Sequence, residues 1–409
     1  MRPPTILIIG AGQAGGCAAA TLRKEGYQGR IVLAGVEEYR PYERPPLSKG
    51  VLDGSQSDTS IFLHTSSFYE EVNIEWLPKV HIESICADSR VATMSGGETI
   101  AFDQCLIATG GRPREFVGVN EDMPNVHYLR SLADVVSMRK KIKPAARAVV
   151  IGGGFLGLEF ASTVHAQGVE VTVLEAGDCI MGRAVPRIFS AWLADRYEKA
   201  GIEIVCNAKI QSIDYGETGG QVRLDGRVVE SDFCLIAIGQ LPNVELAEAA
   251  GLTVNNGIVV DASGETSAPG IFAAGDCASH FNCFLKKMVR LESWQNAQEQ
   301  AIVAAKAMIG VEAHYNVVPW FWSDQLGFNI QMLGSPEAHL RYVVRGDTTA
   351  DQFIIFGFDG ETPRCVLAVN KGGDIRPLRT LLETHLVIAS ETLLDPSRSL
   401  REIVKAAAA

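Results

Sequence analysis

A glycine-rich turn between an apolar run and a helical segment occurs twice in this 409-residue chain. In the second copy, within Ala146–Glu175, Ala148–Ile151 leads into the turn Gly152–Gly157, and the chain returns through Val171–Glu175. This order predicts a strand, a tight turn, a helix and a parallel strand. In such a unit the three glycines allow the turn, the approach of phosphates and close helix–strand packing. The pattern therefore predicts that a pyrophosphate binds at a helix N-terminus.

The first copy opens the chain. Thr5–Ile9 is predicted as a buried parallel strand, Gly10–Gly15 as the turn and Arg30–Gly35 as the second strand. The turn glycines expected to contact a dinucleotide are Gly10, Gly12 and Gly15 in this copy and Gly152, Gly154 and Gly157 in the other.

An acid about 20 residues beyond such a turn can accept hydrogen bonds from a ribose hydroxyl. Glu175 has this position in the second copy. In the first copy Glu37 and its neighbour Glu38 are both candidates, and an ordinary surface role for Glu37 is the alternative.

Each copy closes with a further apolar strand that ends in an Ala-x-Gly turn. The first ends at Ala108-Thr109-Gly110 within Phe102–Gly111, and the second is Phe233–Gly239. Because the whole unit is repeated, the chain is expected to bind two dinucleotides that meet.

Composition narrows the remaining choices. The net charge is −11, which disfavours general nucleic-acid binding. The nine cysteines are scattered and form no C-x-x-C, which disfavours disulfide frameworks, zinc sites and iron–sulfur clusters. We therefore expect reduced thiols in a cytoplasmic protein without a metal site. The apolar segment Thr5–Leu22 contains the turn glycines and follows a poor signal-peptide start, so no membrane segment is expected.

The later part of the chain adds two features. Gly270–Ala278 is predicted as a strand that ends in a Gly275-Asp276 turn before a helix, with Asp276 as a cofactor ligand or a plain N-cap. Arg290–Met308 is predicted to be helical. Beyond Pro319, short strand-like runs and a helix around Ile375–His385 predict a smaller domain with an antiparallel sheet. The runs are Phe328–Leu333, Leu340–Val344, Gln352–Phe358 and Cys365–Val369.

These motifs together resemble the flavoproteins with two dinucleotide-binding domains, the pyridine nucleotide-disulfide oxidoreductase superfamily. Within them, Arg44–Lys49, Ala108–Pro113, Arg290–Ser293 and Pro319–Gln325 are similar to the ferredoxin reductases of oxygenase systems. The resemblance covers essentially the whole chain. It implies an α/β fold with two Rossmann-like domains, arranged as in glutathione reductase, and a C-terminal α+β domain.

The resemblance also implies domain boundaries. An FAD domain would comprise residues 1–112 and 245–318, an NAD domain residues 113–244, and a C-terminal domain residues 319–409 that covers the flavin face. Many relatives place an acid directly after the second-strand glycine, where this chain has Val36. Glu37, one residue further on, is then the candidate acid for the FAD ribose.

The site residues implied by the resemblance fall into two groups. Those expected at FAD are Gly10, Gly12, Gly15, Glu37, Arg44, Pro45, Lys49, Ala108, Thr109, Gly110, Arg130, Asp276, Trp294 and Trp320. Those expected at NADH are Gly152, Gly154, Gly157, Glu159, Glu175, Arg183 and Gly239.

Lys49 and Glu159 are expected to pair near flavin N5 and to act in catalysis, because a buried lysine needs a partner. Glu175 should favour NADH by repelling the 2′-phosphate of NADPH, although Arg183 nearby would weaken that preference. Trp320 and Trp322 are expected to pack over the flavin region or in an ordinary core. Two stretches of basic residues could dock an acidic ferredoxin, and the alternative is that both are ordinary solvated surface. The first stretch is Lys286, Lys287 and Arg290, and the second is Lys371, Arg376 and Arg379.

Related disulfide reductases carry a cysteine pair in the loop that here is Glu43–Lys49, and oxidases carry one reactive cysteine. Their absence implies that electrons pass directly from FAD to an external acceptor. The expected activity is FAD-dependent NADH:ferredoxin reduction, with a [2Fe–2S] ferredoxin serving a cytochrome P450 or a ring-hydroxylating Rieske oxygenase. One alternative is reduction of rubredoxin, quinone or a small oxidant. Another is a role like that of apoptosis-inducing factor, and the lack of a targeting segment and of long insertions argues against that role. The chain is expected to be a monomer or a homodimer.

Overall fold

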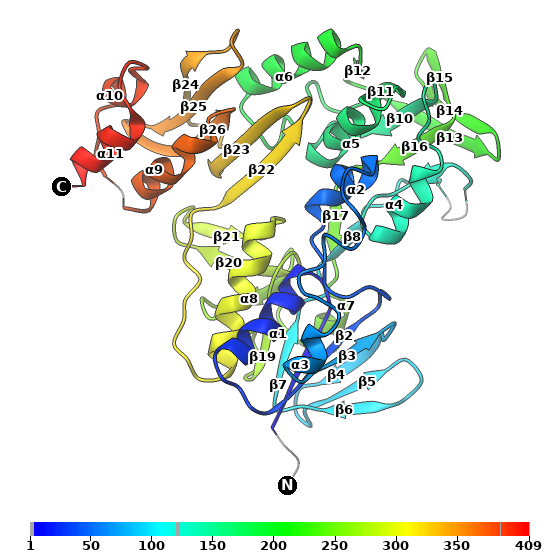
Figure 1. Cartoon of the computed structure of the whole chain (residues 1–409), viewed down its shortest axis with the longest axis vertical. Helices are drawn as coiled ribbons and strands as arrows, with labels where there is room; N and C mark the ends of the chain where they lie inside the picture. The colour runs from blue at the N-terminus through cyan, green and yellow to red at the C-terminus, as the bar shows by residue number, and fades with distance from the viewer. Residues whose placement is uncertain (1–3, 120–122, 385, 409) are drawn as a thin grey trace. The chain divides into compact units, whose positions relative to one another are not determined.

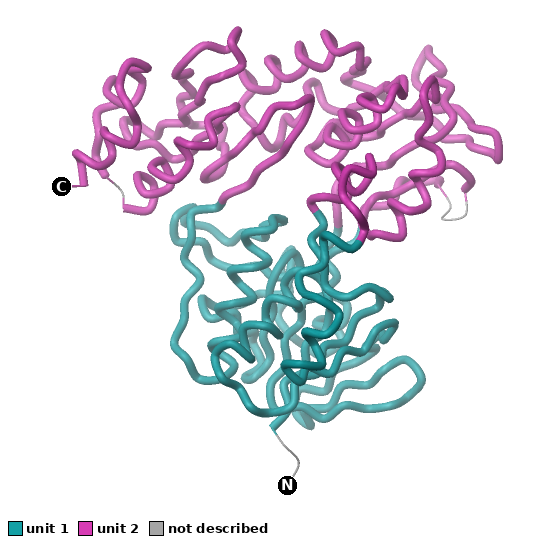
Figure 2. The backbone as a smooth tube through the Cα atoms, viewed as in Figure 1, with its two compact units in different colours: residues 1–44, 59–112, 241–319 teal, residues 45–58, 113–240, 320–409 magenta. Residues whose placement is uncertain are grey.

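The computed structural model describes residues 4–119, 123–384 and 386–408. The chain divides into two compact units, shown in Figure 2. Unit 1 comprises residues 1–44, 59–112 and 241–319, and unit 2 comprises residues 45–58, 113–240 and 320–409. The chain crosses between them at residues 44–45, 58–59, 112–113, 240–241 and 319–320, and the third and fourth crossings lie in the short strands β8 (Gly111–Pro113) and β17 (Gln240–Pro242).

Unit 1 is built on a five-stranded parallel sheet in the order β19-β7-β1-β2-β3. The strands are β1 (Thr5–Ile9), β2 (Arg30–Gly35), β3 (Ile74–Pro78), β7 (Gln104–Ile107) and β19 (Ile271–Ala273). Buried apolar residues fill β1 and nearly all of β2, as expected for strands covered on both faces. This is the parallel, Rossmann-like sheet predicted for the first glycine repeat.

Two long helices, α1 (Gln13–Lys24) and α8 (Trp294–Met308), cover one face of this sheet and contact each other (Figure 1). Their contact surfaces are rich in alanine, including Ala18, Ala301 and Ala304, so their backbones can approach closely. The other face packs against smaller elements. These are β4 (Ile82–Cys86), β5 (Val91–Met94), β6 (Thr99–Ala101), α7 (Glu245–Ala249), β18 (Ile258–Val260), β20 (Ala278–Asn282) and β21 (Lys287–Val289), with α3 (Phe68–Glu71) beside β3.

Unit 2 contains a second parallel sheet, in the order β12-β11-β10-β16-β9. Its strands are β9 (Val126–His127), β10 (Arg147–Ile151), β11 (Glu170–Leu174), β12 (Glu203–Val205) and β16 (Phe233–Ile236). An antiparallel meander packs on one face through a shared apolar core: β13 (Ile210–Gly216), β14 (Gly219–Leu224) and β15 (Arg227–Ser231). The helices of this part are α2 (Gly50–Asp53), α4 (Leu132–Arg139), α5 (Phe155–His165) and α6 (Arg187–Ala200), with a 3₁₀ turn at Pro45–Ser48.

The C-terminal part of unit 2 is an antiparallel sheet in the order β22-β23-β26-β25-β24. Its strands are β22 (Trp320–Gln325), β23 (Phe328–Gly334), β24 (Arg341–Asp347), β25 (Gln352–Asp359) and β26 (Thr362–Val369), followed by α9 (Gly372–Glu383), α10 (Ser390–Leu394) and α11 (Leu400–Ala407). Helix α6 packs on this sheet, where the ring of Trp192 lies against Phe328 and Phe353. The sheet confirms the predicted antiparallel C-terminal fold.

Several predicted elements differ from the structure in type or in their first or last residue. The Gly275-Asp276 turn leads into strand β20 and not into a helix, so Asp276 is not an N-cap. Helix α8 begins at Trp294, after Ser293 has capped it, and not at Arg290. The helix predicted around Ile375–His385 is α9, Gly372–Glu383, and His385 lies outside the described residues.

Among the residues that the structure describes, no helix combines the length and the apolar character needed to cross a bilayer.

Candidate functional site

The first glycine turn has the shape needed to receive a phosphate group. Gly10 has a φ of +109°, and a Cβ there would lie 2.2 Å from the carbonyl oxygen of Ala108. A Cβ on Gly15 would lie 1.9 Å from the carbonyl oxygen of Gly10, so only glycine lets α1 pack this closely. By contrast, a Cβ on Gly12 would meet no described atom within 4 Å. Gly12 therefore leaves open space at the start of the helix.

The second turn repeats this geometry. A Cβ on Gly152, whose φ is +110°, would lie 2.3 Å from the oxygen of Ala237, and one on Gly157 would lie 2.1 Å from the oxygen of Gly152. Gly154 again has open space within 4 Å among the described atoms. In the described part of the chain, neither α1 nor α5 has a side-chain cap or an acid in its first turn. Both N-termini thus keep amide donors and a favourable dipole for an anion.

Glu175 stands at the end of β11 beside the second turn. Its Oε2 accepts a 2.7 Å hydrogen bond from the amide of Gly153, and its Oε1 accepts one of 2.7 Å from the amide of Gly177. The carboxylate is therefore fixed next to the phosphate-binding turn. Arg183 is exposed, and Gly239 has a φ of +103° after β16.

In unit 1 the acid Glu37 is held by two neighbours. Its Oε1 lies 2.6 Å from Nη2 of Arg44, and the hydroxyl of Tyr42 donates to its Oε2 at 2.5 Å. Arg44 also interacts electrostatically with Asp276. Glu38 is exposed and pairs with Lys79. Of the two candidate acids, Glu37 is the one fixed in a polar cluster with Arg44 and Asp276.

The turn Ala108-Thr109-Gly110 is locked by Asn243. The Asn243 side chain donates to the oxygen of Thr109 at 2.9 Å, the Thr109 hydroxyl donates to the oxygen of Asn243 at 2.8 Å, and the Asn243 amide donates to the oxygen of Gly110 at 2.9 Å. These three hydrogen bonds fix the backbone of the turn.

Lys49 and Glu159 form an ion pair, with Nζ 3.0 Å from Oε1. The Glu159 side chain is 8% exposed and the Lys49 side chain 20%. The hydroxyl of Ser48 donates to Oε2 of Glu159 at 2.6 Å, and that of Ser323 donates to Oε1 at 2.5 Å. A buried carboxylate is expensive without partners, and here three donors surround it. Its place beside a flavin remains a proposal.

Sequence reasoning did not assign a role to Ser48 or Ser323. Ser48 lies beside Lys49 in the segment Arg44–Lys49. Ser323 belongs to β22 and comes to Glu159 from a distant part of the sequence. No local pattern announces that contact, since it depends on how β22 packs against α5.

The other predicted FAD residues are distributed over both units. Trp294, in unit 1, donates from Nε1 to Glu43 at 3.1 Å. Pro45, Arg130 and Trp320 belong to unit 2. The ring of Trp320 stacks on Trp322 at 5.0 Å, with the guanidinium of Arg379 over its face. Their expected proximity to a flavin stays a prediction.

One predicted docking residue is not a surface cation. The Arg290 side chain is only 9% exposed, pairs with Glu292 at 2.7 Å and donates to the backbone oxygen of Asp276 at 3.2 Å. These contacts hold the Arg290 side chain against the Asp276 turn. Lys286 and Lys287 remain exposed, in the hairpin that joins β20 and β21.

The cysteines carry no redox pair: all nine are free thiols. Burial, together with the charge of Glu43, raises the pKa of Cys17 to about 11, and burial raises the pKa of Cys277. Because the thiolate is the reactive form, these two thiols are poor nucleophiles at neutral pH. Among the described residues no group of three or more His, Cys, Asp or Glu side chains is arranged to hold a metal ion.

Two open glycine cradles on two parallel sheets, each with a fixed acid near its turn, define a protein built to bind two dinucleotides. The chain belongs to the pyridine nucleotide-disulphide oxidoreductase family, whose model matches residues 4–301. A second model, the reductase C-terminal domain, matches residues 320–404.

Individual relatives match over nearly the whole chain. A ferredoxin–NAD(+) reductase component of the 3-phenylpropionate/cinnamic acid dioxygenase of Photorhabdus laumondii is 36% identical over 95% of this chain and 99% of its own. Putidaredoxin reductase of Pseudomonas putida is 34% identical over 99% of this chain and 97% of its own. A chain in the crystal structure of the covalent putidaredoxin reductase–putidaredoxin complex matches with a TM-score of 0.96 and 33% identity. The match covers 100% of this protein and 100% of that chain.

Proposed function

We propose that this protein is an FAD-dependent NADH:ferredoxin reductase. It would pass electrons from NADH to a [2Fe–2S] ferredoxin that serves a cytochrome P450 or a Rieske oxygenase. Similarity along the entire chain to ferredoxin–NAD(+) reductases, including the reductase of a ferredoxin complex, supports this proposal. FAD, when bound, supplies the link between two-electron and one-electron transfer.

FAD is proposed to bind in unit 1 at the first glycine turn. The open space at Gly12 and the amides at the start of α1 suit its pyrophosphate. Glu37 would accept from the adenosine ribose, and Arg44 would hold that carboxylate in place. Asp276, which interacts electrostatically with Arg44, would accept a hydrogen bond from a further hydroxyl of the cofactor.

NADH is proposed to bind at the second turn, with its pyrophosphate over Gly154 and its ribose hydroxyls at Glu175. Two backbone amides already orient the Glu175 carboxylate, which keeps a fixed negative charge at this position. A 2′-phosphate there would meet like charge, so the site favours NADH over NADPH.

Lys49 and Glu159 are the proposed catalytic pair. Glu159, held by Ser48 and Ser323, fixes the ammonium group of Lys49 in place. A fixed cation of this kind stabilises negative charge that develops on a nearby ring during electron transfer. The pair therefore acts by orientation and charge and needs no covalent intermediate with the protein.

The observation that carries the choice of acceptor lies in residues 43–49. This loop supplies Lys49, which pairs with Glu159 of α5, where the disulfide reductases of the family hold a cysteine pair. Without a thiol relay there, electrons would pass directly to an external acceptor. That logic favours a ferredoxin, and it also admits rubredoxin or a quinone.

Steady-state NADH oxidation by the FAD-loaded protein tests the proposal. We expect a [2Fe–2S] ferredoxin to raise the rate far above that with rubredoxin, a quinone or oxygen as acceptor. Activity that is independent of ferredoxin but high with a quinone would replace the proposed acceptor. Absence of NADH oxidation with every acceptor would favour a non-enzymatic role.

The remaining expectations are proposals of the same kind. The FAD domain is proposed as residues 1–112 and 245–318, the NAD domain as 113–244 and the C-terminal domain as 319–409. A cytoplasmic location and a monomeric or homodimeric state are also proposed, and the native mass in solution would decide between the two states.

A further inference from the structure

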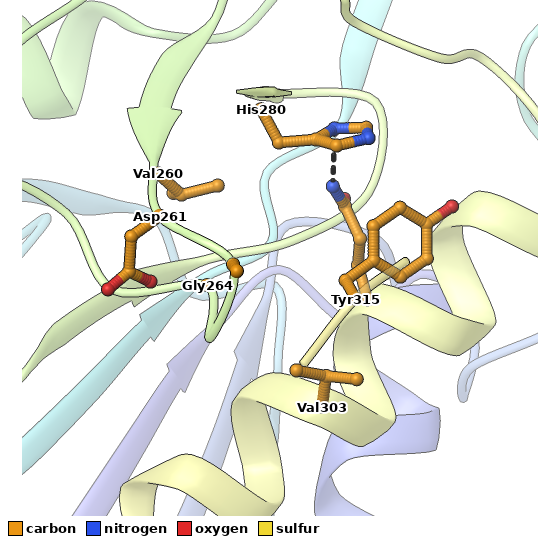
Figure 3. A pocket seen from close by; sticks show the side chains of 8 residues that line it. Val260, Asp261, Gly264, His280, Val303 and Tyr315 are labelled. Carbon is orange, nitrogen blue, oxygen red and sulfur yellow. Dashed lines mark hydrogen bonds between the residues drawn. The ribbon is translucent and has the colours of Figure 1, made fainter. Parts of the chain in front are cut away.

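A buried hydrogen-bond network lies behind the Gly275-Asp276 turn. The backbone amide of Gly275 donates to Oε1 of Gln300 at 2.9 Å, and Nε2 of Gln300 donates to Nδ1 of His280 at 2.9 Å. Figure 3 shows the second of these bonds as a dashed line between His280 on β20 and the helix α8. The side chains of Gln300 and His280 thus form a continuous link from the turn to the neighbouring strand.

The network also includes Asn296, and two backbone groups determine how the side-chain amides of Gln300 and Asn296 are oriented. The amide of Gly275 can only donate, so Gln300 must turn its oxygen toward it. The carbonyl of Leu291 can only accept, so Asn296 must turn its nitrogen toward that oxygen, at 3.0 Å. The oxygen of Asn296 then accepts from the Tyr315 hydroxyl at 2.9 Å, while its nitrogen also donates to Gln300 Oε1 at 3.2 Å.

The orientation of Gln300 in turn determines the tautomer of His280. Since Gln300 presents its nitrogen, Nδ1 of His280 must be an acceptor, and a neutral ring then carries its proton on Nε2. His280 is 2% exposed, and its Nε2 has no hydrogen-bond partner among the described residues. A small pocket with a volume of about 10 Å³ lies beside the ring, between His280, Tyr315, Val303 and the loop 260–264 (Figure 3). One water molecule fits such a volume and would accept from Nε2–H.

We propose that Gln300, which links Gly275 to His280, is a positioning residue for the Gly275-Asp276 turn and thereby for FAD. This inference rests on the proposed binding of FAD at Asp276. Gly275 has a φ of +84° and lies between α1 and α8, where a Cβ would be 3.1 Å from the Cβ of Ala14. The position of the turn is therefore fixed by close packing on one side and by the bond to Gln300.

Removing that bond would leave the buried amide of Gly275 without an acceptor. A buried donor without a partner is costly, so the turn would move to find one. Arg290 also bonds to the backbone of Asp276, but it acts on the next residue and does not satisfy Gly275. Movement of the turn would displace the Asp276 carboxylate from its proposed contact with the cofactor.

The test compares two variants of α8 by their affinity for FAD and by their thermal stability. Gln300→Met preserves the size of the side chain but removes its hydrogen bonds to Gly275, Asn296 and His280. Met308→Ala, the control, makes a cavity in the buried end of the same helix without touching the network. We expect Gln300→Met to weaken FAD binding at least tenfold, a change of ~1.4 kcal/mol. Met308→Ala should lower Tm. Its Kd for FAD should stay within about twofold of that of the unaltered protein, because Met308 lies at the far end of α8 from the network.

Equal FAD affinity in Gln300→Met and the unaltered protein would overturn the inference, as would equal weakening in both variants. If the unaltered protein itself binds no FAD, the proposed function fails first. A second measurement needs no variant: nitrogen NMR of the His280 imidazole should show the proton on Nε2. A proton on Nδ1 would mean that Gln300 turns its oxygen to His280 and not to Gly275, and would overturn the proposal even if Gln300→Met does not fold.

Discussion

Glu159 shows how individual side chains divide the work at the proposed reaction site. It accepts from two serines and pairs with one lysine, so loss of the lysine leaves two neutral hydrogen bonds on a carboxylate that is 8% exposed. Two such bonds do not neutralise the charge. Removing Lys49 does not change the glycine turn proposed to hold FAD. Its effect should therefore appear in the rate of flavin reduction before it appears in cofactor binding.

We predict that Lys49→Met slows reduction of bound FAD by NADH at least tenfold, equivalent to ~1.4 kcal/mol in the barrier. FAD should stay bound, because the glycine turn of unit 1 is unchanged. Stopped-flow absorbance of the flavin measures the rate. Lys199→Met, which removes an exposed lysine paired with Asp195 on α6, is the control and should reduce FAD at the normal rate. An unchanged rate in Lys49→Met would remove Lys49 from catalysis.

Glu175 supports a second prediction at this scale. We expect kcat/KM for NADH to exceed that for NADPH at least tenfold, about 1.4 kcal/mol, because the fixed carboxylate repels a 2′-phosphate. Glu175→Gln keeps an acceptor for one of the two amides and removes the charge, so the preference should shrink. Glu203→Gln, an exposed acid on β12 paired with Arg227, should preserve it. Equal values for both nucleotides in the unaltered protein would contradict the role of Glu175.

The sequence was most informative where a residue's task depends on near neighbours. The spacing of glycines and Glu175 follows from one strand–helix–strand unit, so it can be recognised in a single stretch. The contact of Ser323 with Glu159 cannot, because it joins β22 to α5. Arg290 was misassigned for a similar reason: its charge suggested a surface, whereas Glu292 and the oxygen of Asp276 bind it inward.

At the scale of elements, the Gly275-Asp276 turn was the hardest to predict. A glycine followed by an aspartate is typical of a helix start, yet β20 follows and pairs with β18 and β21. The pairing partners lie elsewhere in the chain, so the local pattern favours the wrong element. Helix α8 carried a usable signal in Ser293, whose hydroxyl accepts from the amide of Asn296.

Strand β20 also contains a buried group that makes stability depend on pH. Burial lowers the pKa of His280 to about 4, against 6.5 for the free side chain. Between these values the unfolded chain binds a proton that the folded protein does not, so the free energy of unfolding falls as pH falls from 6.5 to 4. The side chains that face this ring or its pocket are Asp261 and Tyr315, with Glu299 near Tyr315.

We therefore predict that His280→Asn reduces the loss of unfolding free energy over this pH window by up to about 3 kcal/mol. Urea unfolding at pH 7.5, 6, 5 and 4 would measure the slope. His339→Asn, an exposed histidine, serves as the control and should leave the slope unchanged. The same slope in His280→Asn as in the unaltered protein would show that another group binds the protons.

At the scale of the whole molecule, the structure has one parallel sheet for each strand–helix repeat, as expected, whereas the domain boundaries at residues 112, 244 and 319 stay a prediction. The loop 45–58 is different: it follows the FAD motif in sequence but packs with unit 2. Ion pairs explain this, since Lys49 binds Glu159 and Asp58 binds Arg139. Such contacts depend on tertiary structure and leave no periodic pattern in the loop itself.

The charge of the whole molecule bears on how it would meet a ferredoxin. The chain carries −11, so an acidic partner is repelled at long range unless local cations attract it. With Arg290 turned inward, the exposed cations of the first predicted stretch are Lys286 and Lys287. They lie beside Phe281 and Met288, cross-strand partners that are 55% and 43% exposed. The hairpin therefore combines apolar surface with positive charge, which would attract an acidic partner.

We predict that the double variant Lys286→Glu and Lys287→Glu raises KM for a [2Fe–2S] ferredoxin at least tenfold and leaves reduction of ferricyanide by NADH unchanged. Lys140→Glu with Lys141→Glu is the matched control: it reverses an adjacent exposed pair and gives the same net charge. If only total charge mattered, both variants would lose ferredoxin activity equally. The ferredoxin rate of the unaltered protein should also fall as salt rises, because screening shortens to about 8 Å at physiological ionic strength. A rate insensitive to salt and to the hairpin variant would place ferredoxin docking away from this hairpin.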